Sequence, residues 1–198
     1  MRIVLVICMT LFWACGANRT EILRSKMNAY LEAKALADGS HHQFVADTFK
    51  TWFEDRQGKP IIRIKGEASK GPWAEWDEVF HSKSTLKGGL KIDQEDDAVT
   101  GIFFESNEFY ELIGKPPTET TRTFWFDKED KLAEVLIIWK PDQPESDEFL
   151  KPIVEWAQMH DSVTLNEIYP KGKIKPSQEN AVKWREMIKR YKDYSLLR

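Results

Sequence analysis

Asp77 and His81 are the pair whose residue types and spacing come closest to acid–base chemistry. They are four positions apart, and side chains four apart on a helix lie on the same face and can meet. A carboxylate that orients a histidine fixes the tautomer of the ring and shifts its pKa, as general acid–base catalysis needs. The same spacing is also typical of a surface ion pair. His81 follows Phe80 by about 100° of helix rotation, so we expect its side chain to be partly exposed, at the rim of any pocket.

Glu105 is the second acidic candidate. It alternates with Asn107 in a segment that predicts a strand, so its side chain could point into a pocket and act as a base. The alternative is an ordinary strand residue that faces solvent. Asp93 and Glu134 are further acids on predicted strands, and the sequence leaves their direction open. The catalytic candidates are therefore His81, Asp77 and Glu105.

Aromatic side chains from several predicted elements could line a binding pocket. Small-molecule sites are concave and are lined mostly by apolar and aromatic side chains with a few polar groups. The same aromatics could equally fill a core. The ligand-binding candidates are Trp52, Trp76, Phe80, Phe104, Trp125 and Trp139, with Trp73 close in sequence.

Several function classes lack their usual sequence support. The adjacent His41 and His42 diverge around a helix and cannot hold one metal ion together, so we expect no metal site. The sequence has no phosphate-binding glycine loop, no GxSxG and no HExxH, and we predict no cofactor. Lys and Arg number 29 against 32 Asp and Glu, for a net charge of -3. Because the two signs are interleaved, nothing favours nucleic acid as a partner.

The N-terminal segment predicts export. The apolar run Ile3–Ala14 follows a single basic residue and is too short to span a bilayer, as in a secretory signal. Both cysteines, Cys8 and Cys15, lie in this region, so the rest of the chain has no thiol for a disulfide or a metal site.

Phe12-Trp13-Ala14-Cys15 resembles the bacterial lipoprotein signal, in which the cysteine is lipidated. Ordinary cleavage near Cys15 and an uncleaved anchor are the alternatives. We expect residues 1–17 to be the signal and Cys15 to carry the lipid. The protein would then reside in the cell envelope, as a membrane-anchored lipoprotein or a periplasmic protein.

The stretch from Gly101 to Trp139 predicts strands joined by turns. β-Branched and aromatic residues dominate each run, and Gly, Pro and Asp separate them. The expected strands are Gly101–Phe104, Phe109–Ile113, Thr121–Phe126 and Lys131–Trp139. Shorter strands are expected at Ile61–Lys65 and Leu90–Asp93.

Apolar residues at helical spacing predict three helices before these strands. The first begins at Thr20 and ends near Leu36. The second follows a capping box at Ser40–Gln43 and carries Phe44, Val45, Thr48, Phe49, Trp52 and Phe53 until Gly58. The third opens at Pro72, with Trp73, Trp76, Val79 and Phe80 on one face.

Gly114-Lys115-Pro116-Pro117-Thr118, followed by a strand, an acidic turn and Lys131-Leu132-Ala133-Glu134, resembles the end of the nuclear-transport-factor-2-like superfamily, in its SnoaL-like bacterial branch. Asp130 stands where the hairpin glycine of that pattern usually sits. The resemblance implies an α+β cone, in which a curved antiparallel sheet packs on N-terminal helices around a pocket. The superfamily includes isomerases, dehydratases, cyclases, hydrolases and binding domains, so the function must be argued from the site.

The resemblance ends near residue 140, and we expect a domain at 18–140 followed by a C-terminal helical extension at 141–198. Phe149, Ile153, Trp156 and Met159 predict one amphipathic helix, and Ala181, Trp184, Ile188 and Tyr191 predict a second that Ser177 caps. Phe124–Phe126 and Val135–Trp139 are apolar on both strand faces, so we predict that these helices cover the outer face of the sheet. The resemblance also allows a homodimer through that face.

Three functions follow from these observations. The first is an exported, lipid-anchored domain that binds a small apolar or amphipathic molecule in its cone without chemistry. The second is a SnoaL-like isomerase, cyclase or hydratase that uses acid and base groups of the pocket. The third is a structural or partner-binding lipoprotein with a filled cone.

Overall fold

The computed structural model describes residues 3–36, 39–54, 60–64 and 72–197, with side chains from residue 19 onward except in and around the gaps. The chain forms two compact units, each built from several segments. The first, called the sheet unit, comprises Met1–Gly66, Leu86–Phe103 and Thr120–Trp139. The second, called the helical unit, comprises Glu67–Thr85, Phe104–Glu119 and Lys140–Arg198.

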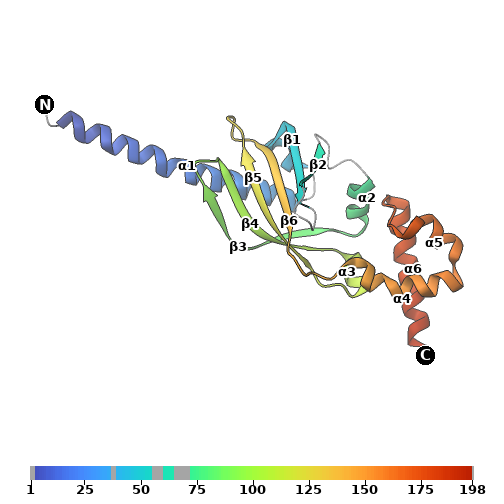
Figure 1. Ribbon diagram of the computed structural model, residues 1–198. Helices are drawn as coiled ribbons and strands as arrows, with labels where there is room; N and C mark the ends of the chain where they lie inside the picture. Colours follow the sequence, from blue (N-terminus) through green and yellow to red (C-terminus); the bar gives the residue numbers. More distant parts are fainter. Residues whose placement is uncertain (1–2, 37–38, 55–59, 65–71, 198) are drawn as a thin grey trace. The chain divides into compact units, whose positions relative to one another are not determined.

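The strands form one mixed sheet (Figure 1). In the described part of the chain its order is β2-β1-β6-β5-β4-β3. The strands are β1 (Val45–Glu54), β2 (Pro60–Ile64), β3 (Lys83–Asp93), β4 (Ala98–Ser106), β5 (Thr118–Phe126) and β6 (Leu132–Trp139). β1 pairs antiparallel with β2 and β5 pairs antiparallel with β6, but β1 and β6 are parallel. The expected purely antiparallel sheet is therefore wrong at this pair.

Helices precede, interrupt and follow the sheet. They are α1 (Ile3–Ala35), α2 (Pro72–Val79), α3 (Glu108–Ile113), α4 (Ser146–His160), α5 (Ser162–Ile168) and α6 (Gln178–Leu196). Short 3-10 turns lie at Ser40–Phe44 and Pro170–Gly172. A curved sheet combined with helices and followed by a C-terminal helical extension confirms the predicted α+β class (Figure 1).

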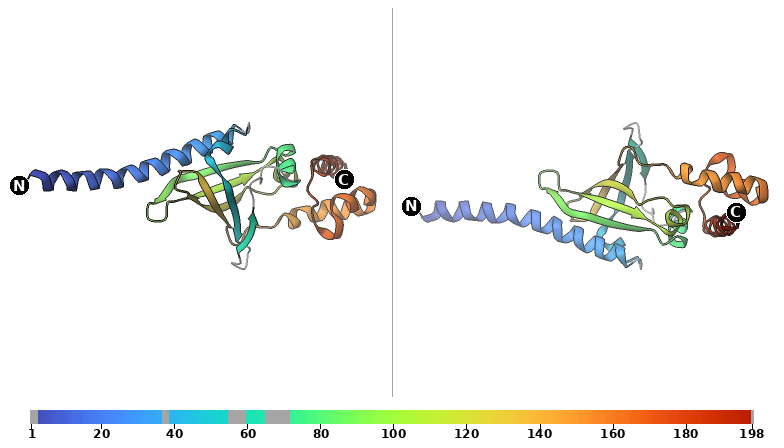
Figure 2. Two further views of the ribbon diagram at one scale, coloured as in Figure 1. Left: turned by 90° about the horizontal axis from the view of Figure 1, so that it is seen from above. Right: turned by 90° about the horizontal axis from the view of Figure 1, so that it is seen from below.

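The core of the sheet unit lies between α1 and one face of the sheet. Leu23, Met27 and Tyr30 recur every three or four residues, so they form one stripe on α1. This stripe is buried together with strand residues of β4, β5 and β6, namely Val99, Phe103, Phe124, Phe126, Leu132 and Val135. Figure 2 shows α1 running along the sheet and continuing past the ends of the strands.

Strand β5 alternates strictly between buried and half-buried residues from Thr118 to Phe126. Phe124 and Phe126 belong to the core shared with α1, so the intervening Trp125 lies on the opposite face of the sheet. Leu136 and Ile138 of β6 are also half-buried. The prediction that the C-terminal helices cover this outer face stays a prediction.

The core of the helical unit is formed by the extension together with α2 and α3. Its buried residues come from the extension and from the segments around α2 and α3. They are Trp184, Met187 and Ile188 of α6, Leu150 and Ile153 of α4, and Trp76, Phe80, Phe109 and Ile113. The Ser177 side chain accepts a hydrogen bond from the Asn180 backbone N–H, which confirms the predicted cap of α6. Met159 was expected on the apolar face of α4, but 75% of it is exposed.

Two predicted elements have the wrong type. The expected second helix is the 3-10 turn Ser40–Phe44 followed by β1, whose parallel pairing with β6 joins residues far apart in sequence. The expected strand Phe109–Ile113 is α3. The Asn107 side chain caps its start by accepting from the Tyr110 N–H, and Gly114 ends it with φ 76°.

Candidate functional site

The predicted Asp77–His81 pair does not share a helical face. α2 ends at Val79, and His81 follows it with φ 51°. The His81 side chain is exposed, as predicted. The Asp77 carboxylate accepts a hydrogen bond from the Ser82 hydroxyl at 2.7 Å, and its carbonyl accepts from the Ser82 N–H at 2.9 Å. The chain thus turns at the end of the helix and brings Ser82 to the carboxylate, because a positive φ cannot continue a helix.

Two further polar contacts lie near Ser82 in the helical unit. The Asn107 amide donates to the Ser82 hydroxyl at 3.3 Å, while its oxygen caps α3. Glu105 is half-buried, and its carboxylate accepts from the Ser84 hydroxyl at 2.9 Å. Two of the three catalytic candidates, Asp77 and Glu105, are therefore each held by a serine from the segment that follows α2.

Tyr110, Lys115 and Thr118 form a polar cluster that sequence reasoning missed. The Lys115 Nζ donates to the Thr118 Oγ1 at 2.6 Å and lies 3.8 Å from the centroid of the Tyr110 ring. Only 9% of Lys115 is exposed. An ammonium over an aromatic face is attracted by the ring, which helps to offset the cost of its burial. Gly114-Lys115-Pro116-Pro117 was expected only as a turn, and a lysine between Gly and Pro carried no signal for burial.

Burial raises the pKa of the Tyr110 hydroxyl above its ordinary value. The negative charges of Glu105 and Asp77 raise the pKa further, and the hydrogen bond with Thr118 lowers it. The phenol is therefore protonated at neutral pH and could donate a hydrogen bond. Its neighbour Lys115 is nearly closed to solvent, however, so a reacting molecule would have little access to this pair.

Trp76 and Phe80 are core residues of the helical unit. Trp76 is 3% exposed and Phe80 is fully buried. The Phe109 ring centroid lies 5.1 Å from that of Trp76 and 5.2 Å from that of Phe80. These separations are typical of packed aromatic pairs. Both side chains therefore fill the interior of the unit. The sequence left open this alternative, in which the aromatics form a core and do not line a pocket. Phe104, a further candidate, is half-buried.

The other three aromatic candidates belong to the sheet unit. The Trp52 Nε1 donates to the Glu134 Oε2 at 3.0 Å, and Lys50 pairs with the Glu134 Oε1 at 3.0 Å. Trp125 is directly opposite Glu134 in the pairing of β5 with β6. Trp52 and Trp125 thus flank β6 on the face away from α1, whereas Trp139 is 38% exposed near the other end of β6.

A shallow groove of about 290 Å³ lies in the helical unit, where α3, α4 and α6 meet. Its apolar lining comes from Leu112, Ile113, Phe149, Pro152, Ile153 and Tyr191, and its charged lining residues are Glu111 and Lys192. Ile113 and Ile153 are buried at its base, whereas Glu111, Pro152 and Lys192 are exposed. None of the residues predicted as a ligand site from the sequence lines this groove.

The remaining predictions concern the N-terminus and metals. The Cys15 side chain lies outside the described side chains, and its lipidation stays a prediction. Among the residues described, no helix is both long enough and apolar enough to cross a membrane. The same residues contain no group of three or more His, Cys, Asp or Glu that could hold a metal ion.

Comparison with solved structures finds AusH from Aspergillus nidulans, with 17% identity and a TM-score of 0.50 over 64% of this chain and 88% of that chain. PrhC from Penicillium brasilianum NBRC 6234 is 9% identical, with a TM-score of 0.49 over 75% of this chain and 97% of that one. A protein of unknown function with a cystatin-like fold from Methylobium petroleophilum PM1 is 14% identical, with a TM-score of 0.44 over 66% of this chain and 80% of that chain.

No family model and no curated protein match this sequence. The likeness to AusH, together with the curved sheet and its helices, shows that the chain has a nuclear-transport-factor-2-like α+β fold. At 17% identity this likeness concerns the fold alone, so the function rests on the side chains of this protein.

Proposed function

We propose that this protein is an exported, lipid-anchored member of the SnoaL-like branch that binds a small amphipathic molecule without chemistry. The groove bounded by α3, α4 and α6 is the observation that carries this proposal. Small-molecule sites combine an apolar lining with a small number of polar groups, and this lining has that composition.

The groove replaces the cone aromatics as the preferred binding site. Trp76 and Phe80 are packed against Phe109 and have almost no exposed surface, so they offer a ligand nothing to contact. Leu112, Phe149 and Tyr191, by contrast, are only partly buried. A ligand that covered them would remove apolar surface from water, which contributes about 25 cal/mol per Å².

The charged lining residues indicate the class of ligand. Glu111 and Lys192 are both exposed in the groove lining and carry opposite charges. An apolar body with one polar or charged head would place the body on Leu112, Phe149 and Tyr191 and the head beside one of these charges. The volume of about 290 Å³ is at the lower end of the range for small-molecule sites, so the ligand is small.

Titration with the fluorescent amphiphile anilinonaphthalene sulfonate tests this site. Pro152→Phe places a ring in the groove and removes a proline from the interior of α4, so the fold should tolerate it. We expect the dissociation constant of the dye for Pro152→Phe to be about tenfold or more above that for the unsubstituted protein, which corresponds to about 1.4 kcal/mol of binding free energy. Met159→Phe is the matched control, because Met159 lies on the same helix, is 75% exposed and does not line the groove. Equal affinities for the two variants would refute the groove as the site.

The Tyr110–Lys115 pair favours a second candidate, a SnoaL-like isomerase, cyclase or hydratase. A protonated phenol beside an ammonium could stabilise an oxyanion, which is the main task in such reactions. The burial of Lys115 weighs against this reading. Turnover of a carbonyl substrate that is lost in Tyr110→Phe but kept in Pro152→Phe would favour the enzyme.

The export part of the proposal rests on the apolar segment that ends at Cys15 and on the absence of later cysteines in the sequence. Cys15→Ala should release the protein from membranes, since the thiol is the point of lipid attachment. Soluble cytoplasmic protein that keeps its Met1, identified by mass spectrometry, would contradict this part of the proposal.

A further inference from the structure

Helix α1 joins the expected anchor directly to the strands of the sheet unit. It runs without interruption from Ile3 to Ala35, so Cys15 and Arg19 lie on the same helix. Four residues of α-helix advance by about 6 Å. Arg19 therefore lies about one helical turn after Cys15, the expected site of lipid attachment.

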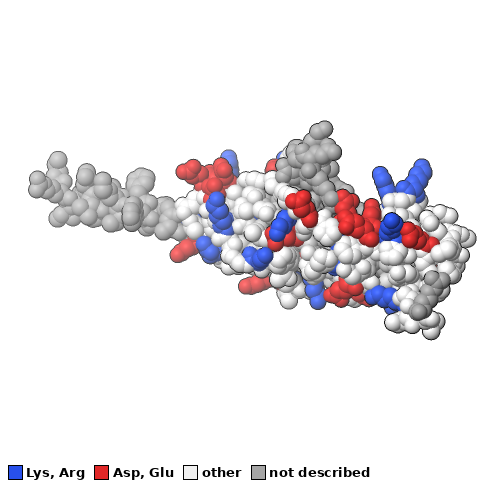
Figure 3. Space-filling model, turned by 60° about the horizontal axis from the view of Figure 1, so that its bottom comes forward, with Lys and Arg blue, Asp and Glu red and all other residues white. Residues whose placement is uncertain are grey.

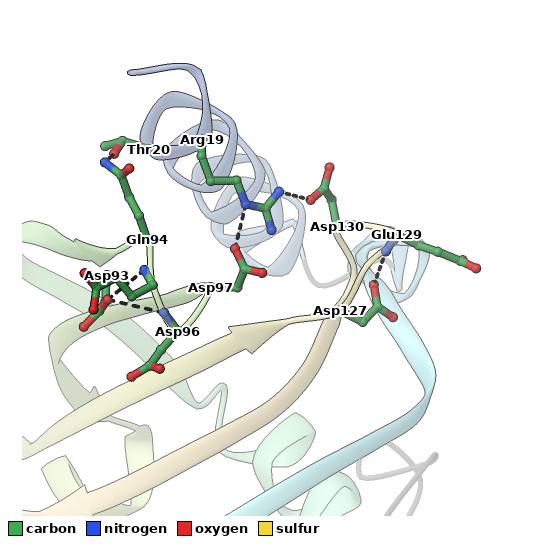
Figure 4. Close-up of polar contacts among 10 residues, drawn as sticks. Arg19, Thr20, Asp93, Gln94, Asp96, Asp97, Asp127, Glu129 and Asp130 are labelled. Carbon is green, nitrogen blue, oxygen red and sulfur yellow. Dashed lines mark hydrogen bonds and ion pairs between the residues drawn. The ribbon is translucent and has the colours of Figure 1, made fainter. Parts of the chain in front are cut away.

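Arg19 is fixed to the ends of two hairpins (Figure 4). Its Nε donates to Asp97 at 2.7 Å, in the turn between β3 and β4. Its Nη1 contacts Asp130, in the turn between β5 and β6. The neighbouring Thr20 contacts Gln94 of the first turn. The pKa of Arg19 is raised, and the main cause is the hydrogen bonds that its guanidinium donates to Asp97 and Asp130.

The backbone of both turns presents these carboxylates to the helix. Asp97 and Asp130 have φ values of 49° and 57°, which non-glycine residues seldom adopt and aspartate adopts more readily than most. Asp127 supports the second turn, because its carboxylate accepts from the N–H groups of Glu129 and Lys131 at 2.8 and 3.0 Å. The turns are therefore ordered structures that Arg19 ties to the helix.

We propose that the ends of these two hairpins, Asp93–Asp97 and Asp127–Lys131, face the surface of the membrane to which the protein is anchored. This inference rests on the proposed lipid anchor. A lipid on Cys15 holds that residue at the bilayer surface, and the rigid helix leaves about 6 Å between it and Arg19. The burial of Leu23, Met27 and Tyr30 holds α1 against the strands of the sheet unit.

The charge of this surface selects the kind of membrane. The two turns together with Arg19 carry seven carboxylates and three cations. Figure 3 shows acidic side chains at the end of the described surface next to the N-terminal segment. An anionic leaflet would repel this surface within about a Debye length, roughly 8 Å at physiological salt. The surface fits a zwitterionic headgroup layer, which carries no net charge to repel it.

Site-specific quenching tests the orientation with the lipidated chain in phosphatidylcholine vesicles that carry a nitroxide on the headgroup. The mature chain has no cysteine besides the lipidated Cys15, so a single introduced cysteine can be labelled with a fluorophore. Glu129→Cys places the label on a hairpin turn, and Trp139→Cys places it at the far end of β6. From Leu132 to Trp139 the strand extends about 23 Å.

We expect at least about twofold stronger quenching of the label at position 129, because headgroup quenchers act over less than the length of this strand. A flexible Gly-Ser insert of about ten residues after Ala17 should abolish the difference, since such a linker reaches about 17 Å in any direction. Equal quenching at both positions without the insert, or stronger quenching at 139, would overturn the orientation. Protein that does not bind the vesicles at all would overturn the anchor as well, so the two failures are distinguishable.

Discussion

Substitution of Trp184 tests whether the C-terminal extension is part of the fold. Trp184 of α6 is fully buried, and its ring centroid lies 5.9 Å from that of Phe109 of α3 and 5.7 Å from that of Tyr169. Trp184→Ala removes the largest side chain at the centre of this core. Truncations of this size cost about 3–5 kcal/mol, because the transfer energy is lost and a cavity remains.

This loss is large compared with the total stability of a typical domain, about 5–15 kcal/mol. Urea denaturation followed by circular dichroism should therefore show a much lower midpoint for Trp184→Ala. Val182→Ala is the matched control on the same helix, because Val182 is 45% exposed and should change stability by less than about 0.5 kcal/mol. A loss below about 1 kcal/mol for Trp184→Ala would refute the packing described for α6.

The same reasoning applies to a chain that ends at residue 140. Such a chain lacks α4, α5 and α6, and it would expose Trp76, Phe80 and Phe109, which are now buried. An exposed apolar patch of this kind promotes aggregation. We expect the truncated chain to be insoluble, and a stable, monomeric chain of residues 18–140 would show that the extension is a separate addition.

Two further predictions concern single residues. Gly101→Ala should destabilise the protein by about 1 kcal/mol in urea denaturation, at the low end of the cost of overpacking. The added Cβ would lie 2.8 Å from a terminal methyl of Leu86, which can shift, and 3.1 Å from the ring of Phe103, which is fully buried. Unchanged stability would contradict this packing. Tyr110→Phe should lose less stability than the wild type as the pH rises above about 10, the ordinary pKa of the tyrosine hydroxyl. The pKa of the Tyr110 hydroxyl is raised from 10.0 in the folded state, so the folded protein holds this proton more tightly and the wild type loses stability as the pH rises above the unfolded value. Parallel losses in the two proteins would show that the phenol does not contribute.

The elements predicted correctly are those with local signals at their ends. Ser177 caps α6 and Pro72 opens α2, and both signals lie within one turn of the helix that they start. β5 and β6 were predicted from dense runs of β-branched and aromatic residues around an acidic turn. Asp130 adopts φ 57° there, so it meets the conformational requirement of the glycine that it replaces.

The errors arose where distant contacts decide the structure. The spacing of Phe49, Trp52 and Phe53 fits one face of a helix, but β1 pairs on one side with β6, more than eighty residues away, and on the other with β2. Secondary-structure propensity is a weak preference that tertiary pairing overrides. α3 is only six residues long, so its periodicity could not be distinguished from that of a strand.

The candidate site was harder to predict than the fold. The Asp77–His81 argument required α2 to continue beyond Val79, and the helix ends there. Lys115 and Thr118 are three positions apart in a turn, and only the structure shows that they bond beneath the Tyr110 ring. The groove combines three helices from distant parts of the sequence, and no local pattern indicates such a meeting.

The arrangement of α3 bears on the choice between the two proposed functions. Tyr110 directs its hydroxyl toward Thr118, whereas the lining of the groove begins one residue later, at Glu111, and continues through Gly114. Tyr110 itself does not line the groove. General acid catalysis requires hydrogen-bond reach between the acid and the reacting atom. Tyr110, whose pKa is raised, is thus not among the residues that a molecule in the groove would contact, and this separation supports the proposal of binding without chemistry.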